Sequence, residues 1–236
     1  MSKFFNFEEK DCDIPFYNGI PELSKGKWGL LVLGLILFFA LIWVPIDISD
    51  TVFSILMCLV LLIPTLIALN GNWSLMFKKI RRSDLKPIII AVVIQLVYSF
   101  LILYVLEYAG MTSSSPASTE TASTTLISFI SMVIQLMGEE LFQVILMIIL
   151  MAITYKFLNR KVSIVISVII TLAAFGFLHE GYYGGLLQVL LVQGLGSLLT
   201  LLLYIKTKNI MVSYASHLLY DCFPLLLEII IFLLSF

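Results

Sequence analysis

Long apolar segments recur along the chain, and they constrain its fold more than any other feature. Several of these segments reach the roughly 20 residues that an α-helix needs to cross a bilayer. Hydrophobic residues make up 61% of the chain and charged residues only 12%. A soluble domain could not bury that much apolar surface. We therefore predict an all-α protein, a polytopic transmembrane helical bundle in contact with the lipid bilayer.

We expect about seven spans, which run from Trp28 to Pro45, Thr51 to Leu69, Pro87 to Tyr108, Thr125 to Phe157, Val162 to His179, Tyr183 to Ile205 and Ile210 to Leu234. The fourth is longer than an untilted crossing requires, so it is tilted, broken or continued into the cytoplasm. The chain then divides into a cytoplasmic N-terminal tail (1–27), three N-terminal transmembrane helices (28–109), a flexible external loop rich in Ser and Thr (110–124) and a C-terminal helical core (125–236).

The 14 Lys and Arg residues fall in four places: the N-terminal tail and the connections between spans two and three, four and five, and six and seven. With seven spans, these places all lie on one face of the membrane. The positive-inside rule makes that face cytoplasmic, so we expect a cytoplasmic N-terminus and a multi-pass protein of a bacterial plasma membrane. The net charge of −1 gives no indication of a nucleic-acid partner, and the three Cys residues form no CxxC pair.

Five ionisable residues lie inside the apolar segments: Glu139, Glu140, His179, His217 and Asp221. Such groups cost roughly 2.5–3.5 kcal/mol at membrane depth on insertion scales, so they are rare there and usually functional. Packing residues that join helices through hydrogen bonds are the alternative interpretation of each one. Five of them in three separate spans, which hold both histidines of the chain, favour a buried polar site.

The spacing of these residues suits proton transfer or metal binding. His217 and Asp221 are four residues apart and project from one helix face, so the carboxylate fixes the tautomer of the imidazole and raises its basicity. Glu139 and Glu140 point about 100° apart, so we expect one to face the cavity and a neighbouring helix to hold the other. A carboxylate of this pair is the expected general base.

Three short motifs carry a family resemblance. They are Gly138-Glu-Glu-Leu-Phe-Gln143, Phe175-Gly-Phe-Leu-His179 and His217-Leu-Leu-Tyr-Asp221. In this order, and in apolar segments, they resemble the CPBP family of intramembrane proteases, which comprises CAAX proteases and bacteriocin-processing enzymes and is also called the Abi family. The resemblance covers about Ile134 to Pro224.

One position departs from that family, whose first motif is Glu-Glu-x-x-x-Arg. This chain has Val144 in place of the arginine, directly after Gln143. The departure leaves altered specificity, a lower rate and lost catalysis all open. Asp221 stands where Asn is commoner, within the family's tolerance.

The resemblance implies roles for the site residues. Glu140 or Glu139 would activate water as general base, and His179 and His217 would bind a metal or stabilise the oxyanion, with Asp221 supporting His217. Zinc held by His179, His217 and Glu140 is one expectation, because two His and a carboxylate leave a position open for water. A metal-free glutamate mechanism is the other.

The expected function is therefore that of an intramembrane endopeptidase, a metalloprotease or CAAX-type peptidase, which hydrolyses a peptide or a membrane-anchored protein. Family members connect it with bacteriocin immunity, leader processing or peptide signalling. The alternative, motivated by the missing arginine, is a non-catalytic membrane regulator or immunity protein that binds a sensor kinase or components of a bacteriocin system. A proton-coupled transporter is a third interpretation.

The assigned spans leave one conflict. They place His179 near the outer end of its span, Glu140 near the middle of the membrane and His217 near the inner end. A helix break or a tilted fourth span would be needed to bring the three side chains to one level.

Overall fold

The computed structural model describes residues 3–112, 126–180, 185–224 and 227. All regular secondary structure in these ranges is helical, which confirms the predicted fold class. The main helices are α1 (Lys25–Trp43), α2 (Asp50–Leu69), α3 (Arg82–Tyr108), α4 (Leu126–Thr154), α5 (Arg160–Leu178), α8 (Leu198–Thr207) and α9 (Ile210–Asp221).

Six helical segments of the described chain are long and apolar enough to cross a membrane, in agreement with the first six predicted spans. The sixth, Leu186–Thr207, is irregular: α7 (Leu186–Val189), a π-helical turn η3 (Leu190–Gly194) and a 3-10 turn η4 (Leu195–Ser197) precede α8. In the seventh, α9 has 12 residues, and much of the rest of Ile210–Leu234 lies outside the described residues. Most of the predicted external loop, 113–124, also lies outside them.

Polar residues at the helix ends explain where several helices begin. Ser24 and Ser49 accept hydrogen bonds from backbone N–H groups in the first turns of α1 and α2, and Asn159 and Asn209 do the same for α5 and α9. These side chains accept hydrogen bonds from N–H groups that have no partner within the helix. An N–H group without a hydrogen bond is especially costly in an apolar solvent.

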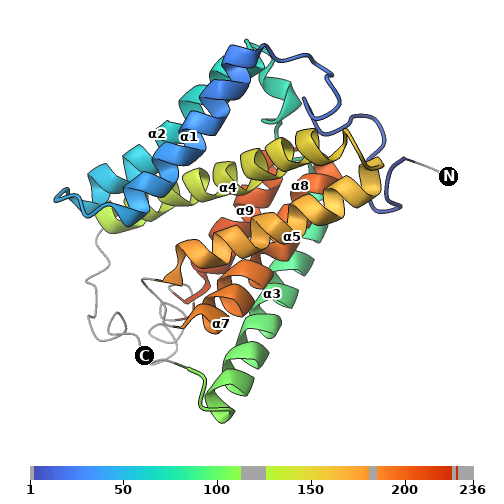
Figure 1. Ribbon diagram of the computed structural model, residues 1–236. Coiled ribbons are helices and arrows are strands. Elements are labelled where there is room, and N and C mark those ends of the chain that lie inside the picture. The colour runs from blue at the N-terminus through green and yellow to red at the C-terminus, as the bar shows by residue number, and fades with distance from the viewer. Residues whose placement is uncertain (1–2, 113–125, 181–184, 225–226, 228–236) are drawn as a thin grey trace.

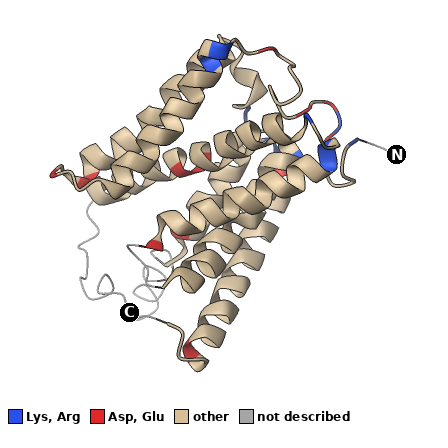
Figure 2. Cartoon of the chain, viewed as in Figure 1, with Lys and Arg blue, Asp and Glu red and all other residues tan. Residues whose placement is uncertain are grey.

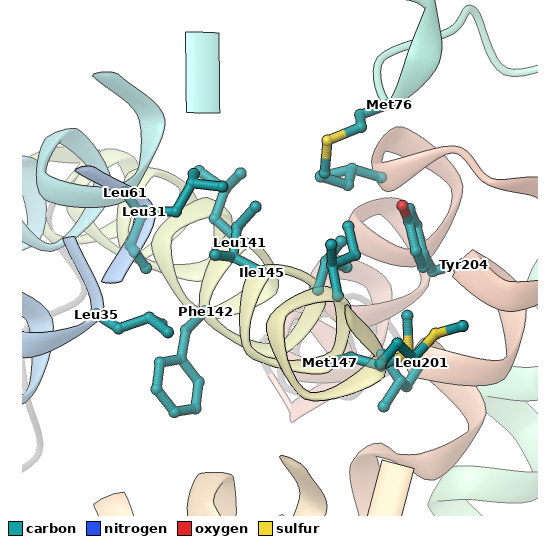
Figure 3. Close-up of a cluster of buried hydrophobic side chains, with 14 of the residues drawn as sticks. Leu31, Leu35, Leu61, Met76, Leu141, Phe142, Ile145, Met147, Leu201 and Tyr204 are labelled. Atoms are coloured by element: carbon teal, nitrogen blue, oxygen red, sulfur yellow. The ribbon is translucent and has the colours of Figure 1, made fainter. Parts of the chain in front are cut away.

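Helix α4 is the centre of the arrangement. Figure 1 shows α1 and α2 side by side on one flank, α3 on the other, and α4 and α5 crossing between them. The core seen in Figure 3 includes buried side chains along α4, among them Leu141, Ile145 and Met147. The ring of the fully buried Phe142, also from α4, stacks on Phe38 of α1 at a centroid distance of 5.0 Å. Leu61 of α2 and Tyr204 of α8 belong to the same core cluster. This central position lets α4 present its polar residues to several helices at once.

The residues before α1 are packed against the ends of the helices, which their polar composition did not predict. Ile14, Phe16 and Tyr17 are 0%, 2% and 5% exposed and belong to the same apolar cluster as Phe142. The Tyr17 ring also contacts that of Tyr155, beyond the end of α4, edge to face at 4.9 Å. In Figure 2, the blue parts of the ribbon, which mark Lys and Arg residues, lie toward this end of the molecule.

Candidate active site

A contact between α4 and α9 joins two of the predicted site residues. The imidazole Nδ1 of His217 lies 3.1 Å from Oε1 of Glu140, and both side chains are buried. The two residues are 77 positions apart in the chain. The fold therefore brings together a carboxylate and an imidazole that the sequence places in separate segments.

The other ring nitrogen of His217 faces Asp221. Nε2 lies 3.5 Å from Oδ2, as expected for residues four apart in a helix. A neutral imidazole carries only one N–H, so two ionised carboxylates are both satisfied only when His217 is protonated. His217 is thus held from both sides, and its ring orientation is fixed.

Phe175 forms an aromatic wall between the two histidines. Its ring centroid lies 4.8 Å from that of His179 and 6.2 Å from that of His217, edge to face in both cases. Nδ1 of His179 lies 2.9 Å from the carbonyl oxygen of Phe175. A carbonyl oxygen only accepts, so Nδ1 carries the hydrogen and Nε2 is the nitrogen that faces away from this bond. The structure thus places both histidines beside one buried ring.

Glu139 has a different environment from its neighbour. Its Oε1 accepts a hydrogen bond of 3.0 Å from the Gln135 side chain, one turn earlier in α4. Ser54 of α2 in turn donates to Gln135 at 3.3 Å. The two glutamates therefore diverge as expected from their helical angle: Glu140 faces α9, and Glu139 is tied to the α2 side.

The close packing of α2 against α4 at this level depends on Gly138. A Cβ added there would lie 2.7 Å from the backbone oxygen of Met57 and 3.0 Å from the backbone nitrogen of Cys58. Only glycine permits this approach, because the neighbouring atoms belong to the backbone and cannot rotate away. Gly138 directly precedes the glutamate pair, so this contact fixes how close to α2 the carboxylates lie.

The predicted conflict between the levels of the site residues is removed by the turn before α9. Lys208 and Asn209 in this turn are 0% and 3% exposed, so the turn lies inside the protein rather than at its surface. The side chain of Asn209 exchanges two hydrogen bonds with the backbone of Lys78, and Ile210 donates to the backbone oxygen of Met76. The buried start of α9 brings His217 to the level of Glu140.

The position that departs from the family motif lies in the apolar core. Val144 is 0% exposed and belongs to the main hydrophobic cluster. Gln143 is also 0% exposed, and neither polar atom of its amide has a partner among the described residues. The chain therefore offers no guanidinium at this point of α4.

The described residues do not fit a zinc site in this arrangement. No group of three or more His, Cys, Asp or Glu side chains within the described ranges is placed to hold a metal ion. Both nitrogens of His217 face carboxylates, and Nδ1 of His179 faces a carbonyl oxygen. The expected ligand set of His179, His217 and Glu140 would need His217 to leave one of its carboxylates.

Some supporting residues were not found from the sequence. Gln135 could have been, because it lies one turn before Glu139 on the same helix face. Tyr214 donates from α9 to the backbone oxygen of Val133 at 2.8 Å, and the Tyr220 hydroxyl lies 2.7 Å from Ser99 of α3. No sequence pattern marks these tyrosines, because their partners come from distant helices.

Part of the chain that holds these residues is similar to a known family. Residues 121–223 match the family described as Type II CAAX prenyl endopeptidase Rce1-like. The predicted resemblance is confirmed. The matched segment covers less than half of the chain, contains all three motifs and is similar to membrane proteases of the CAAX type. No curated protein matches the chain. No solved structure matches it either.

Proposed function

We propose that the protein is an intramembrane endopeptidase that hydrolyses an amide bond in a peptide or in a membrane-anchored protein. One observation carries the proposal: the Glu140–His217 contact, which assembles a buried acid–base pair from two motifs of the matched family segment. Buried ionisable groups at membrane depth are costly, and a pair aligned in this way is typical of a catalytic site.

Glu140 would act as general base. Its Oε1 accepts from His217, and we assign its second oxygen, Oε2, to the attacking water. The carboxylate takes one proton as the water oxygen bonds to the scissile carbonyl carbon. That proton then passes to the departing amine as the C–N bond breaks.

His217 would keep Glu140 oriented, with Asp221 holding the far side of the ring. His179 would stabilise the developing oxyanion from its protonated ring, because a neutral ring whose Nδ1–H donates to the carbonyl oxygen of Phe175 has no second N–H to donate. A donor that is positioned before the reaction stabilises that charge without reorganisation. No step of this scheme needs a metal, so the mechanism we propose is that of a glutamate-dependent peptidase.

The test is a comparison of peptides in the native host with the gene deleted. The deletion strain is complemented with wild type, Glu140→Gln or Glu107→Gln at matched membrane levels, and released and membrane peptides are analysed by mass spectrometry. Glu107 is an exposed acid near the end of α3 and serves as the control. Peptides that appear with wild type and Glu107→Gln but not with Glu140→Gln support the proposal. Identical profiles for all three proteins contradict it.

A non-catalytic membrane regulator is the second candidate, and Val144 favours it. A family arginine is replaced there by a buried aliphatic side chain. A regulator would rescue the deletion phenotype equally well with Glu140→Gln and wild type, whereas the peptidase would not. The same peptide comparison distinguishes roles in bacteriocin immunity, leader processing and peptide signalling, because the substrate that accumulates in the deletion strain identifies the process.

Orientation and location are also part of the proposal. We propose that the N-terminus is cytoplasmic and the membrane a bacterial plasma membrane, on the basis of the positive-inside rule. Labelling of Cys12 in right-side-out and inverted vesicles with an impermeant thiol reagent tests this orientation. If the reagent labelled Cys12 only from the outer face, the N-terminus would lie outside the cell and the proposed orientation would be wrong.

A further inference from the structure

The N-terminal segment forms a buried ionic cluster with the inner ends of the site helices. Arg160, the first residue of α5, donates to both oxygens of Glu8 at 2.8 and 2.6 Å and also pairs with Asp13 at 2.8 Å. Lys208, in the turn between α8 and α9, pairs with Glu8 at 3.0 Å. Arg160 and Lys208 are 4% and 0% exposed, and the side chain of Glu8 is 0% exposed. Two buried cations thus face two carboxylates, of which Glu8 is fully buried and Asp13 partly buried.

Further contacts bind the same segment to the same turn. Glu9 donates its backbone N–H to the backbone oxygen of Lys206 at 3.0 Å and accepts from Lys208 on its own backbone oxygen at 2.7 Å. The side chain of Glu9 pairs with Arg81, which directly precedes α3, at 2.6 Å. Residues 3–23, which we call the N-terminal cap, therefore join the starts of α5 and α9 and the loop before α3.

The electrostatics show that Glu8 is ionised. Burial raises the pKa of Glu8, but hydrogen bonds from Arg160, from the backbone of Phe5 and from Lys208 outweigh burial, and the net shift is downward. A buried ion pair is costly to break on one side, because the remaining partner is left uncompensated. Neutralising Glu8 would leave Asp13 as the carboxylate that faces Arg160, and Lys208 without its carboxylate partner.

The cap lies at the base of the helices that carry the site. His179 follows α5, which begins at Arg160, and His217 lies two turns beyond the buried turn at Lys208. A helix transmits a shift of its first turn along its axis because its backbone is rigid. We infer that the N-terminal cap is a positioning element of the active site, which acts through Arg160 and Lys208 to hold the two histidines at the level of Glu140.

This inference rests on the proposed peptidase for its kinetic test but not for its structural test. The variant is Glu8→Gln, which keeps the shape of the side chain and removes its charge. The matched control is Glu22→Gln, an exposed acid of the same segment. A second variant, Glu8→Gln with Lys208→Met, removes one cation together with the carboxylate and restores the charge balance of the cluster.

The structural test measures how fast N-ethylmaleimide labels each of the three native cysteines in detergent solution. Mass spectrometry follows the labelling. Cys12 lies in the cap, with its Sγ 3.1 Å from Nζ of Lys78, and Cys222 follows the last residue of α9. Cys58 is buried in α2 and serves as the internal control. In Glu8→Gln we expect labelling of both Cys12 and Cys222 to accelerate about tenfold, because local opening becomes more frequent, with Cys58 unchanged.

We expect Glu8→Gln to affect kcat much more than KM. In Glu8→Gln, kcat should fall on the order of tenfold with KM within twofold, because small displacements of catalytic groups reduce rate more than binding. The charge-balanced double variant should recover most of kcat and of the protection of both thiols. Glu22→Gln should match wild type.

Two results would overturn the inference. Faster labelling of Cys12 with unchanged Cys222 and unchanged kcat would show that the cap is a local structure without influence on the site. Unchanged labelling of both thiols would show that the Glu8 cluster does not hold the cap. If wild type itself has no peptidase activity, the proposed function fails, while the labelling of Cys222 still decides whether the cap positions α9.

Discussion

Gly138→Ala tests whether the close approach of α2 and α4 positions the carboxylates. The added Cβ would lie 2.7 Å from the backbone oxygen of Met57, and ordinary contact begins at 3.4 Å. The helices must therefore separate by about 0.7 Å, since a carbonyl oxygen has no rotamer to adopt. Overpacking of this kind costs about 1–3 kcal/mol, against a gain of up to about 1 kcal/mol in helix propensity. We expect a net loss of stability of up to about 2 kcal/mol.

The effect on activity should exceed the effect on stability. Glu139 and Glu140 follow the substituted residue directly, so a separation of α2 and α4 displaces both relative to their partners. A misplacement near 1 Å costs up to about 10²-fold in rate, so we expect a fall in kcat of about 10- to 100-fold.

The matched control is Gly29→Ala in α1, where an added Cβ meets nothing within 4 Å. Thermal unfolding in detergent and peptide hydrolysis at matched protein concentration measure the two effects for both variants. If Gly138→Ala and Gly29→Ala were equally stable and equally active, the proposed role of the close helix contact would be refuted.

Three further predictions concern the charges. Asp221→Asn should keep kcat within about tenfold of wild type, because the amide oxygen of Asn can still accept from Nε2 of His217. Asp221→Leu should reduce kcat far more, and equal losses for the two variants in hydrolysis assays would contradict this role of Asp221. Hydrolysis should continue in the presence of 1,10-phenanthroline, and a loss that added zinc reverses would restore a metal role to His179 and His217. Burial raises the pKa values of Glu8 and Asp13, but hydrogen bonds and charge interactions, with Arg160 foremost, together outweigh burial and lower both pKa values. Their contribution to stability is therefore complete above their ordinary pKa values of 4.5 and 3.8 and is lost as pH falls through the lowered values. The unfolding free energy, followed by thermal denaturation, should decline below about pH 4.5 in wild type and less steeply in Glu8→Gln; parallel profiles would contradict the pairing.

Much of the architecture follows from local properties of the chain. A run of about 20 apolar residues can satisfy its backbone in lipid only as a helix, so the first six spans were predictable within a few residues. The spacing of His217 and Asp221 fixes their common helix face, and the angle between Glu139 and Glu140 fixes their divergence. These features need only the period of the helix.

The level of each site residue was not predictable in this way. Counting along the spans placed His217 and Glu140 at different depths, whereas the structure places them 3.1 Å apart. The difference arises at Lys208 and Asn209, whose turn is buried beneath the N-terminal cap. A charged segment can be a solvated tail or a buried lid with the same composition. Only the tertiary structure decides, because the stability of a buried charge depends on partners that come from distant parts of the chain.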